Sequence, residues 1–316
     1  MGELSLIAAV ERALSMRGER VLRGPGDDAA VVRAGGAVAV TSVDAMVEGV
    51  HFKLDTHSPA DVGHKALAAA LSDLAAMGAR TGEAYVVLGL PPGFGEERAL
   101  GLVHAMERLA ERTGAAIVGG DVVGAPQLLV SVTVTGWGDS DHALAHRDGA
   151  RPGHLVGVTG DLGGSGAGML LLESGERDGP LVQRHLRPQP RLEAGAALAA
   201  AGVSAMIDVS DGIATDARHI AERSGVEVVV ELERAPLAPG LREAAERLGR
   251  DPLELAAVAG EDFELLFTAP PDTREALERA AAPLPVTWIG EVREGSGLLL
   301  LGAGGREVSL TGYEHS

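Results

Sequence analysis

The sequence SPADVGHKALAAALSDLAAMG spans residues 58–78 and predicts one long helix. Ser58 suits the capping position, Pro59 suits the first helical position, and Gly78 ends the apolar pattern. The interior of this helix is rich in alanine and leucine, yet it contains Asp73. A carboxylate among apolar side chains is costly unless it has a partner, so Asp73 is a candidate for a functional site.

Strand and helix signals alternate on both sides of this helix. Residues 29–32 and 37–42 are short apolar runs joined across Gly35–Gly36, which predicts a hairpin. Further strands are predicted at 84–90, 115–118 (a buried strand), 128–137, 156–159, 205–209, 226–231, 263–268, 286–289 and 298–301. Further helices are predicted at 96–112, 165–173, 191–201 and 212–224. This pattern is typical of an α/β (α+β) protein with mixed sheets.

The length of 316 residues suits two domains rather than one. The polar segment 146–153 contains Gly149, Pro152 and Gly153, and it is the best candidate for a boundary. We therefore predict one α/β domain at 1–148 and a second at 149–316.

The composition excludes several classes of function. The formal net charge of −18 disfavours nucleic acid and anionic lipid as partners. The absence of cysteine excludes disulfides, thiolate nucleophiles and zinc–thiolate clusters. Residues 1–13 are expected to form an amphipathic helix rather than a signal peptide, and nothing is expected to span a membrane, which together suggest a cytoplasmic protein.

Aspartates form the most informative pattern. They close apolar runs or lie beside glycine, and they are Asp27, Asp28, Asp44, Asp73, Asp121, Asp208 and Asp211. Each one alone is more often a turn residue, but strand ends converge on one edge of a sheet, where α/β folds bind ligands. Mg²⁺ prefers oxygen ligands and bridges substrate phosphates, so the series predicts a site for several magnesium ions.

Two further features each allow two interpretations. The segment Gly160–Ser165 is a glycine-rich turn before a predicted helix, so it could bind a phosphate through its N–H groups or be only a tight turn. Arg147 could contact a nucleotide phosphate or be an exposed arginine of a linker. A P-loop is excluded, because neither lysine follows glycine or precedes serine or threonine in the required pattern. The role of Asp28 is left open.

At this point several motifs, taken in order along nearly the whole chain, resemble the thiamine-monophosphate kinase family. They are GDDA (26–29), DAMVEGVHF (44–52), LSDLAAMGA (71–79), GGD (119–121), Arg147 with GARPG (149–153), DVSDG (208–212), GEDFEL (260–265) and GYEH (312–315). This family belongs to the aminoimidazole-ribonucleotide synthetase superfamily. The resemblance implies an N-terminal domain that dimerises through its sheet and a C-terminal domain that covers the nucleotide.

The resemblance also implies an activity and a set of site residues. The reaction would convert ATP and thiamine phosphate to ADP and thiamine diphosphate. Magnesium would be bound by Asp27, Ser42, the backbone carbonyl of Val43, Asp44, Asp73, Asp121, Asp208 and Asp211. ATP would be held by Gly120, Asp121, Arg147 and Ser210, and thiamine phosphate by His51, Glu261 and Tyr313. Val43 departs from the family, in which a threonine is expected, and only a carbonyl ligand survives that change.

No acid or base residue is expected in the reaction. The accepting phosphate is largely ionised at neutral pH, so it needs no general base, and transfer is expected to be direct and in line. Two alternatives stay open at this point. One is another ATP-using enzyme of the superfamily, and the other is a catalytically silent nucleotide-binding dimer.

Overall fold

The computed structural model of the protein describes residues 21–23 and 27–312. The helix predicted at 1–13 and the predicted substrate residue Tyr313 lie outside these ranges. Within them, none of the helices is both long enough and apolar enough to cross a membrane.

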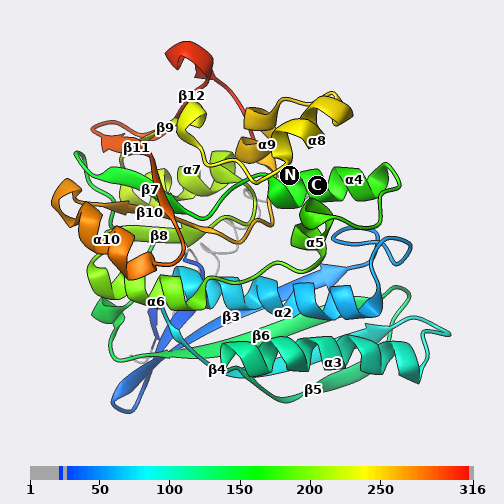
Figure 1. The fold of residues 1–316 in the computed structure, drawn as a ribbon. Coiled ribbons are helices and arrows are strands. Elements are labelled where there is room, and N and C mark those ends of the chain that lie inside the picture. The colour runs from blue at the N-terminus through cyan, green and yellow to red at the C-terminus, as the bar shows by residue number, and fades with distance from the viewer. Residues whose placement is uncertain (1–20, 24–26, 313–316) are drawn as a thin grey trace.

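The first half of the chain forms a six-stranded sheet with two helices on one face (Figure 1). Its order is β1-β2-β3-β6-β4-β5, and only β4 and β5 run parallel. The strands are β1 (Val21–Arg23), β2 (Ala30–Ala34), β3 (Ala37–Val47), β4 (Arg80–Leu90), β5 (Ala116–Gly124) and β6 (Leu129–Gly138), and the helices are α2 (Pro59–Ala76) and α3 (Glu96–Thr113). The predicted hairpin across Gly35–Gly36 is confirmed as β2–β3.

The two predicted helices of this half are confirmed with their capping signals. The Ser58 hydroxyl accepts from the backbone N–H of Asp61, the Asp61 carboxylate accepts from the N–H of Ser58, and Pro59 begins α2. Gly114 ends α3 in the left-handed conformation that glycine adopts at little cost. Nearly every residue of α2 is buried, whereas α3 buries only one stripe of its surface.

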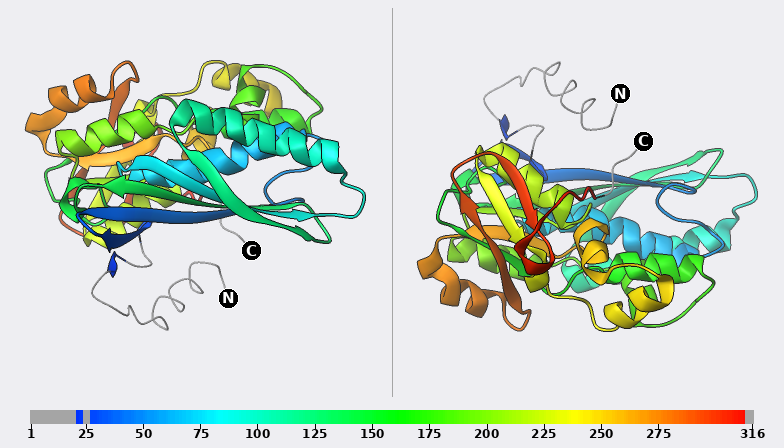
Figure 2. Two further views of the ribbon diagram at one scale, coloured as in Figure 1. Left: turned by 90° about the horizontal axis from the view of Figure 1, so that it is seen from below. Right: turned by 90° about the horizontal axis from the view of Figure 1, so that it is seen from above.

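The second face of the first sheet has no described helix on it (Figure 2). Val43 and Tyr85 are exposed on this face, at 64% and 45%, and so is Val87. The strand predicted as buried at 115–118 is β5, and this prediction is wrong: nearly all of β5 is exposed, because it forms the edge of the sheet and has no described cover on the open face.

The second half of the chain forms a seven-stranded mixed sheet in the order β13-β12-β9-β11-β7-β10-β8. The strands are β7 (Leu155–Thr159), β8 (Ala205–Asp208), β9 (Glu227–Glu231), β10 (Leu265–Ala269), β11 (Val286–Arg293), β12 (Gly297–Leu301) and β13 (Glu307–Val308). The helices are α4 (Gly164–Glu173), α5 (Pro180–Leu186), α6 (Leu192–Ala201), α7 (Ile213–Ser224), α8 (Leu241–Leu248), α9 (Pro252–Val258) and α10 (Arg274–Ala281). The two sheets confirm the predicted fold class. The boundary between residues 148 and 149 stays a prediction.

Helix α2 joins the two halves. One side of it packs on the first sheet, with Leu67 and Leu71 in that core. Its C-terminal end packs against the second half, where Ala75 and Ala76 share a core with Leu198 of α6. Gly195 of α6 lies so close to α2 that a β-carbon there would come 2.0 Å from the carbonyl oxygen of Ala75. Helix α2 thus carries side chains into the junction between the two halves.

Candidate functional site

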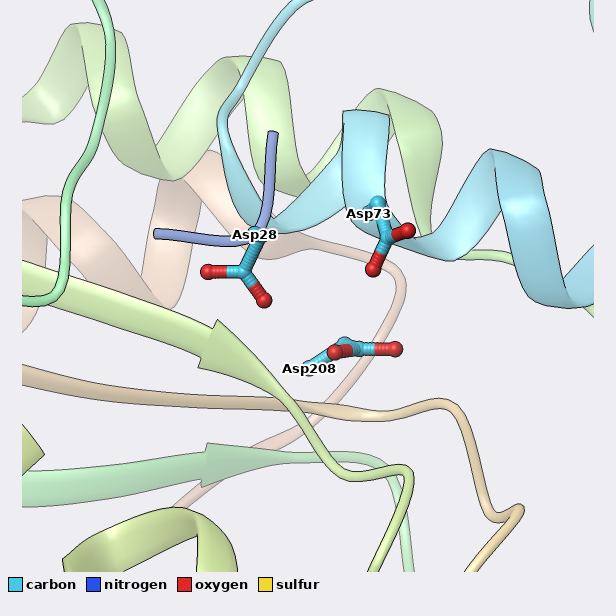
Figure 3. Close-up of side chains that lie close together, drawn as sticks. All are labelled: Asp28, Asp73 and Asp208. Carbon is cyan, nitrogen blue, oxygen red and sulfur yellow. The ribbon is translucent and has the colours of Figure 1, made fainter. Parts of the chain in front are cut away.

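Three carboxylates from separate elements meet at this junction (Figure 3). Asp28 precedes β2, Asp73 lies on α2, and Asp208 is the last residue of β8. Each contributes an oxygen within 4.8 Å of the other two. Asp28 and Asp208 are buried and Asp73 is half-buried, so three acidic groups are gathered where water screens them poorly.

A neighbouring side chain holds each of these carboxylates. The Ser42 hydroxyl donates to Asp73, and the Ser72 hydroxyl donates to Asp208 at 2.6 Å. The guanidinium of Arg147 binds both oxygens of Asp28, through Nε at 2.7 Å and Nη2 at 2.6 Å. Among the described residues, Asp28 is the one carboxylate of the three that is hydrogen-bonded to a basic side chain, and the contact is bidentate.

Burial and mutual repulsion raise the pKa values of this cluster. The pKa of Asp208 is raised to about 8, first by burial and then by the charge of Asp28. Burial, followed by the charges of Asp208 and Asp44, holds the pKa of Asp73 well above its usual value. Burial also raises the pKa of Asp28, although Arg147 opposes this. A divalent cation would remove the repulsion, and carboxylate and hydroxyl oxygens are the ligands that Mg²⁺ prefers, so the donor set fits the metal.

Five of the predicted magnesium residues lie in or beside the acidic cluster. Ser42, Asp73 and Asp208 belong to the cluster, while Asp44 and Asp211 line a cavity beside it. Asp27 has other contacts: its carboxylate lies 3.5 Å from both Arg23 and His146 and accepts from the N–H of Asp28. Val43 exposes its side chain on the open sheet face, so only its backbone oxygen is suited to a metal.

Two of the aspartates expected at strand ends lie within strands, where Asp44 has three residues of β3 after it and Asp121 has three of β5. Each strand continues past its aspartate with a neighbouring valine that favours strand, Val43 before Asp44 and Val122 after Asp121.

Asp121 does not join the cluster within one copy of the chain. It pairs with Val87, Val87 with Ser131, and Ser131 with Ala45 of β3. Three strand spacings put its backbone roughly 14 Å from β3. Paired residues share a face of a sheet, so Asp121 lies on the face of the exposed Val87, opposite the face that Asp44 shares with Ser42 and Met46.

A cavity of about 380 Å³ adjoins the cluster and collects several predicted residues. Ser210, His51 and Glu261 line it together with Asp44 and Asp211. Apolar side chains complete the wall, and they are Met46, Val50, Met169, Val258 and Phe263. The cavity thus offers carboxylates and an apolar surface side by side, which suits a ligand that carries both positive charge and a ring.

The glycine-rich turn Gly160–Ser165 forms no phosphate cradle. The buried carboxylate of Asp262 accepts from the N–H of Gly163 at 2.5 Å and from the N–H of Ser165 at 2.9 Å. These are the donors that a phosphate would need, so the interpretation as a structural turn is the one the structure supports. Asp262 belongs to the motif GEDFEL, but its contact with this turn was not predicted, because it lies about a hundred residues further along the chain.

Two residues that the sequence analysis did not propose for the site, Lys65 and His185, contact Glu261 of the cavity wall. Lys65 of α2 is fully buried, and its ammonium lies 2.7 Å from the Glu261 carboxylate and 3.3 Å from Nε2 of His185. Asp28 was among the aspartates of the predicted magnesium site with its own role left open, and it lies in the acidic cluster. A lone lysine in an apolar run was the only sequence signal for Lys65, since charged residues are rarely buried without a partner.

Comparison with known proteins places this arrangement in a family. The model of the AIR synthase related protein N-terminal domain matches residues 26–137, and that of the C-terminal domain matches residues 151–300. A thiamine-monophosphate kinase of Mycobacterium tuberculosis is 42% identical over 95% of this chain and 88% of its own length. That of Bacillus subtilis is 39% identical over 86% and 85%.

The chain belongs to the thiamine-monophosphate kinase family. Solved structures of the family agree in fold. The structure described as AaThiL complexed with AMPPCP and TMP has a TM-score of 0.88 and 32% identity, and the match covers 100% of this chain and 97% of that one. Hydrogenase maturation protein HypE in complex with ATP, at 21% identity and a TM-score of 0.72, shares the fold.

Proposed function

We propose that this protein transfers the γ-phosphoryl group of ATP to thiamine phosphate, directly and in line, at a site that holds several magnesium ions. The observation that carries the proposal is the convergence of Asp28, Asp73 and Asp208 beside a cavity lined by Asp44, Asp211 and Glu261. Membership of the thiamine-monophosphate kinase family supports the two substrates. A cytoplasmic location belongs to the same proposal, since ATP is a cytoplasmic substrate.

The main obstacle to the reaction is electrostatic repulsion between ATP and thiamine phosphate, which are both polyanions. The chain's own residues would reduce this repulsion by holding magnesium. Bound magnesium would neutralise phosphate charge and align the reacting oxygens. Asp73 and Asp208 would hold the metal, with Ser42 and Ser72 fixing their carboxylates by hydrogen bonds. The accepting phosphate is already largely ionised at neutral pH, so no side chain has to remove a proton from it.

Substrate contacts follow from the cavity wall. Ser210 and Arg147 are proposed to bind the nucleotide, and His51 and Glu261 to bind thiamine phosphate, as is Tyr313 beyond the described residues. The last described residue, Gly312, lies beside Asp211 of the cavity wall, and its N–H donates to the Thr215 hydroxyl at 3.2 Å. Arg147 would retain its bond to Asp28, which couples the nucleotide site to the acidic cluster.

Product analysis tests the proposal. The purified protein is incubated with ATP and Mg²⁺, with and without thiamine phosphate, and products are identified by mass. We expect ADP and thiamine diphosphate only when both substrates and the metal are present. Release of inorganic phosphate from ATP without any dependence on thiamine phosphate would contradict the proposal and favour another superfamily reaction. No ATP turnover at all would favour a silent nucleotide-binding dimer.

We also propose a homodimer formed through the open face of the first sheet. Val43, Tyr85, Val87 and Val123 expose apolar surface there, and apolar patches of this kind usually mark an interface. Asp121 lies at the rim of the same face, and Gly120 precedes it on the edge strand β5. Because Asp121 cannot reach the cluster of its own chain, we propose that it serves the nucleotide and metal of the partner's site.

Mixed dimers test the role of Asp121. Asp121→Ala and Asp208→Asn are each expected to be inactive, and the two chains are co-expressed with different tags so that the heterodimer is purified. If Asp121 acts across the interface, this heterodimer contains one intact site and recovers about half of the wild-type activity. If Asp121 acts within its own chain, neither site is intact and no activity returns. Recovery of full activity would contradict both arrangements.

A further inference from the structure

Lys65 is a buried cation that contacts the cavity wall without reaching the cavity. Its side chain has no exposed surface, and its ammonium donates to Oε2 of Glu261 at 2.7 Å. Lys65 comes from α2 in the first half of the chain, while Glu261 and His185 come from the second. The ion pair therefore bridges the two halves at the edge of the cavity.

The hydrogen bonds around Lys65 fix the protonation of His185. A lysine ammonium can only donate, so Nε2 of His185, at 3.3 Å, accepts from it. The remaining ring nitrogen, Nδ1, then carries the hydrogen and donates to the Ser165 hydroxyl at 3.1 Å. Burial and the charge of Lys65 hold the pKa of His185 well below its usual value, which keeps the ring neutral. His185 is thus a neutral side chain whose two hydrogen bonds hold it in place beside the Lys65 ammonium.

Glu261 is held from its backbone as well as from its side chain. Its φ of 62° lies in the left-handed region that non-glycine residues rarely adopt, and its N–H donates to the carbonyl of Ser210 at 2.8 Å. Gly260 makes this possible, because a β-carbon there would come 2.0 Å from the same carbonyl oxygen. Such local strain is common where a side chain must be presented to a ligand.

The two carboxylate oxygens of Glu261 differ in their surroundings. Oε2 accepts from Lys65 and also lies 3.4 Å from Nδ1 of His185. In the part of the chain that the structure describes, Oε1 has no hydrogen bond or ion pair, and the side chain keeps 28% of its surface exposed at the cavity. One oxygen is therefore anchored and the other is left to accept from a ligand.

We propose that Lys65 is a positioning residue that holds Glu261 so that Oε1 accepts a hydrogen bond from the exocyclic amino group of the substrate's pyrimidine ring. This inference rests on the proposed function. The amino group is the one N–H donor in thiamine phosphate, because the thiazolium ring carries none. Lys65 would thus set the preference for an amino-substituted ring without touching it.

Kinetics with a substrate analogue test this role. Thiamine phosphate is compared with oxythiamine phosphate, in which an oxygen replaces the amino group. We expect the wild-type enzyme to prefer thiamine phosphate by about 10- to 100-fold in kcat/KM, the size of a hydrogen bond to a charged group. Lys65→Met should lose most of this preference, mainly through a higher KM for thiamine phosphate, with little change in the KM for ATP.

Two further variants distinguish a positioning role of Lys65 from a general weakening of the contact between the two halves of the chain. Arg187→Met removes another ion pair between the halves, Arg187 with Asp61 of α2 at 2.8 Å, which lies outside the cavity wall, and it should keep the full preference. Glu261→Gln should lose the preference as Lys65→Met does, and it provides the same test if Lys65→Met does not fold.

The outcomes distinguish this inference from the proposed function. If the wild-type protein does not phosphorylate thiamine phosphate, the proposed function fails. If it does, but the folded Lys65→Met and Glu261→Gln variants discriminate between the two substrates as well as the wild type, the inference is wrong. A loss of preference in Arg187→Met equal to that in Lys65→Met would also overturn it.

Discussion

Replacing Asp208 by asparagine is expected to abolish activity and, at the same time, to stabilise the metal-free protein. Activity should fall by about 10³-fold, because one metal ligand supplies several kcal/mol of charge stabilisation. The metal-free fold should gain stability at neutral pH, because the substitution replaces a carboxyl group that burial and the charge of Asp28 force to stay protonated. The asparagine side-chain oxygen can still accept from Ser72. Calorimetry in chelator and turnover in Mg²⁺ measure the two effects.

The pH dependence of stability in the metal-free protein tests whether the expected gain in Asp208→Asn comes from the raised pKa of Asp208. Asp208 has a folded pKa of about 8, against about 4 in an unfolded chain. A carboxyl group whose pKa is raised in the folded state favours folding below the unfolded value, and this benefit is lost as the pH rises towards the folded value. The thermal midpoint of the wild type in chelator should therefore decrease as the pH is raised from about 4 to about 8. The decrease should be smaller in Asp208→Asn. An asparagine variant that is less stable than the wild type in chelator would refute this account.

Replacing Arg147 by methionine is expected to destabilise the protein strongly. The guanidinium is the basic partner of Asp28, whose side chain has no exposed surface. Removing one partner of a buried pair typically costs about 3–5 kcal/mol, because the remaining charge is left without compensation. Denaturant unfolding in chelator measures the loss in free energy of unfolding.

The double variant Asp28→Asn with Arg147→Met should recover a substantial part of that loss, since the carboxylate that Arg147 pairs with is removed as well. Arg80→Met is the matched control, because Arg80 pairs with Asp139 at 2.8 Å on the surface and should change stability by no more than about 1 kcal/mol. Equal losses in the single and double variants would show that packing of the arginine, rather than its charge, is what matters.

Local signals predicted many of the elements, although the helices α5, α8, α9 and α10 were not predicted. The capping residues around Ser58, the glycines that end helices and the strand alternation of 128–137 depend on neighbours in sequence, and each is found near its predicted place. The burial of β5 was predicted wrongly because burial, unlike strand formation, does not depend on neighbours in sequence alone. Apolar composition indicates a strand, but whether anything covers the strand depends on the rest of the chain or on a second chain.

The composition of the site was only partly predictable. Asp73 and Asp208 were found because each contradicts or closes an apolar run. The partners of the acidic residues were not, since Arg147 lies 119 positions from Asp28 and Lys65 lies 196 from Glu261. Nothing local distinguishes Asp28 from Asp27, and it is the packing of Arg147 that directs Asp28 into the cluster. Contacts of this kind are set by how the two sheets meet on α2.

The burial of α2 has a consequence for how the molecule unfolds. Two separate sheets could melt as two units, but here one helix contributes to the core of the first sheet and to one of the two cores of the second half. Loss of this helix would open both of those cores, so the chain should behave as one cooperative unit with a single transition. A ligand that binds residues of only one half would then protect the amides of both halves from hydrogen exchange to the same extent.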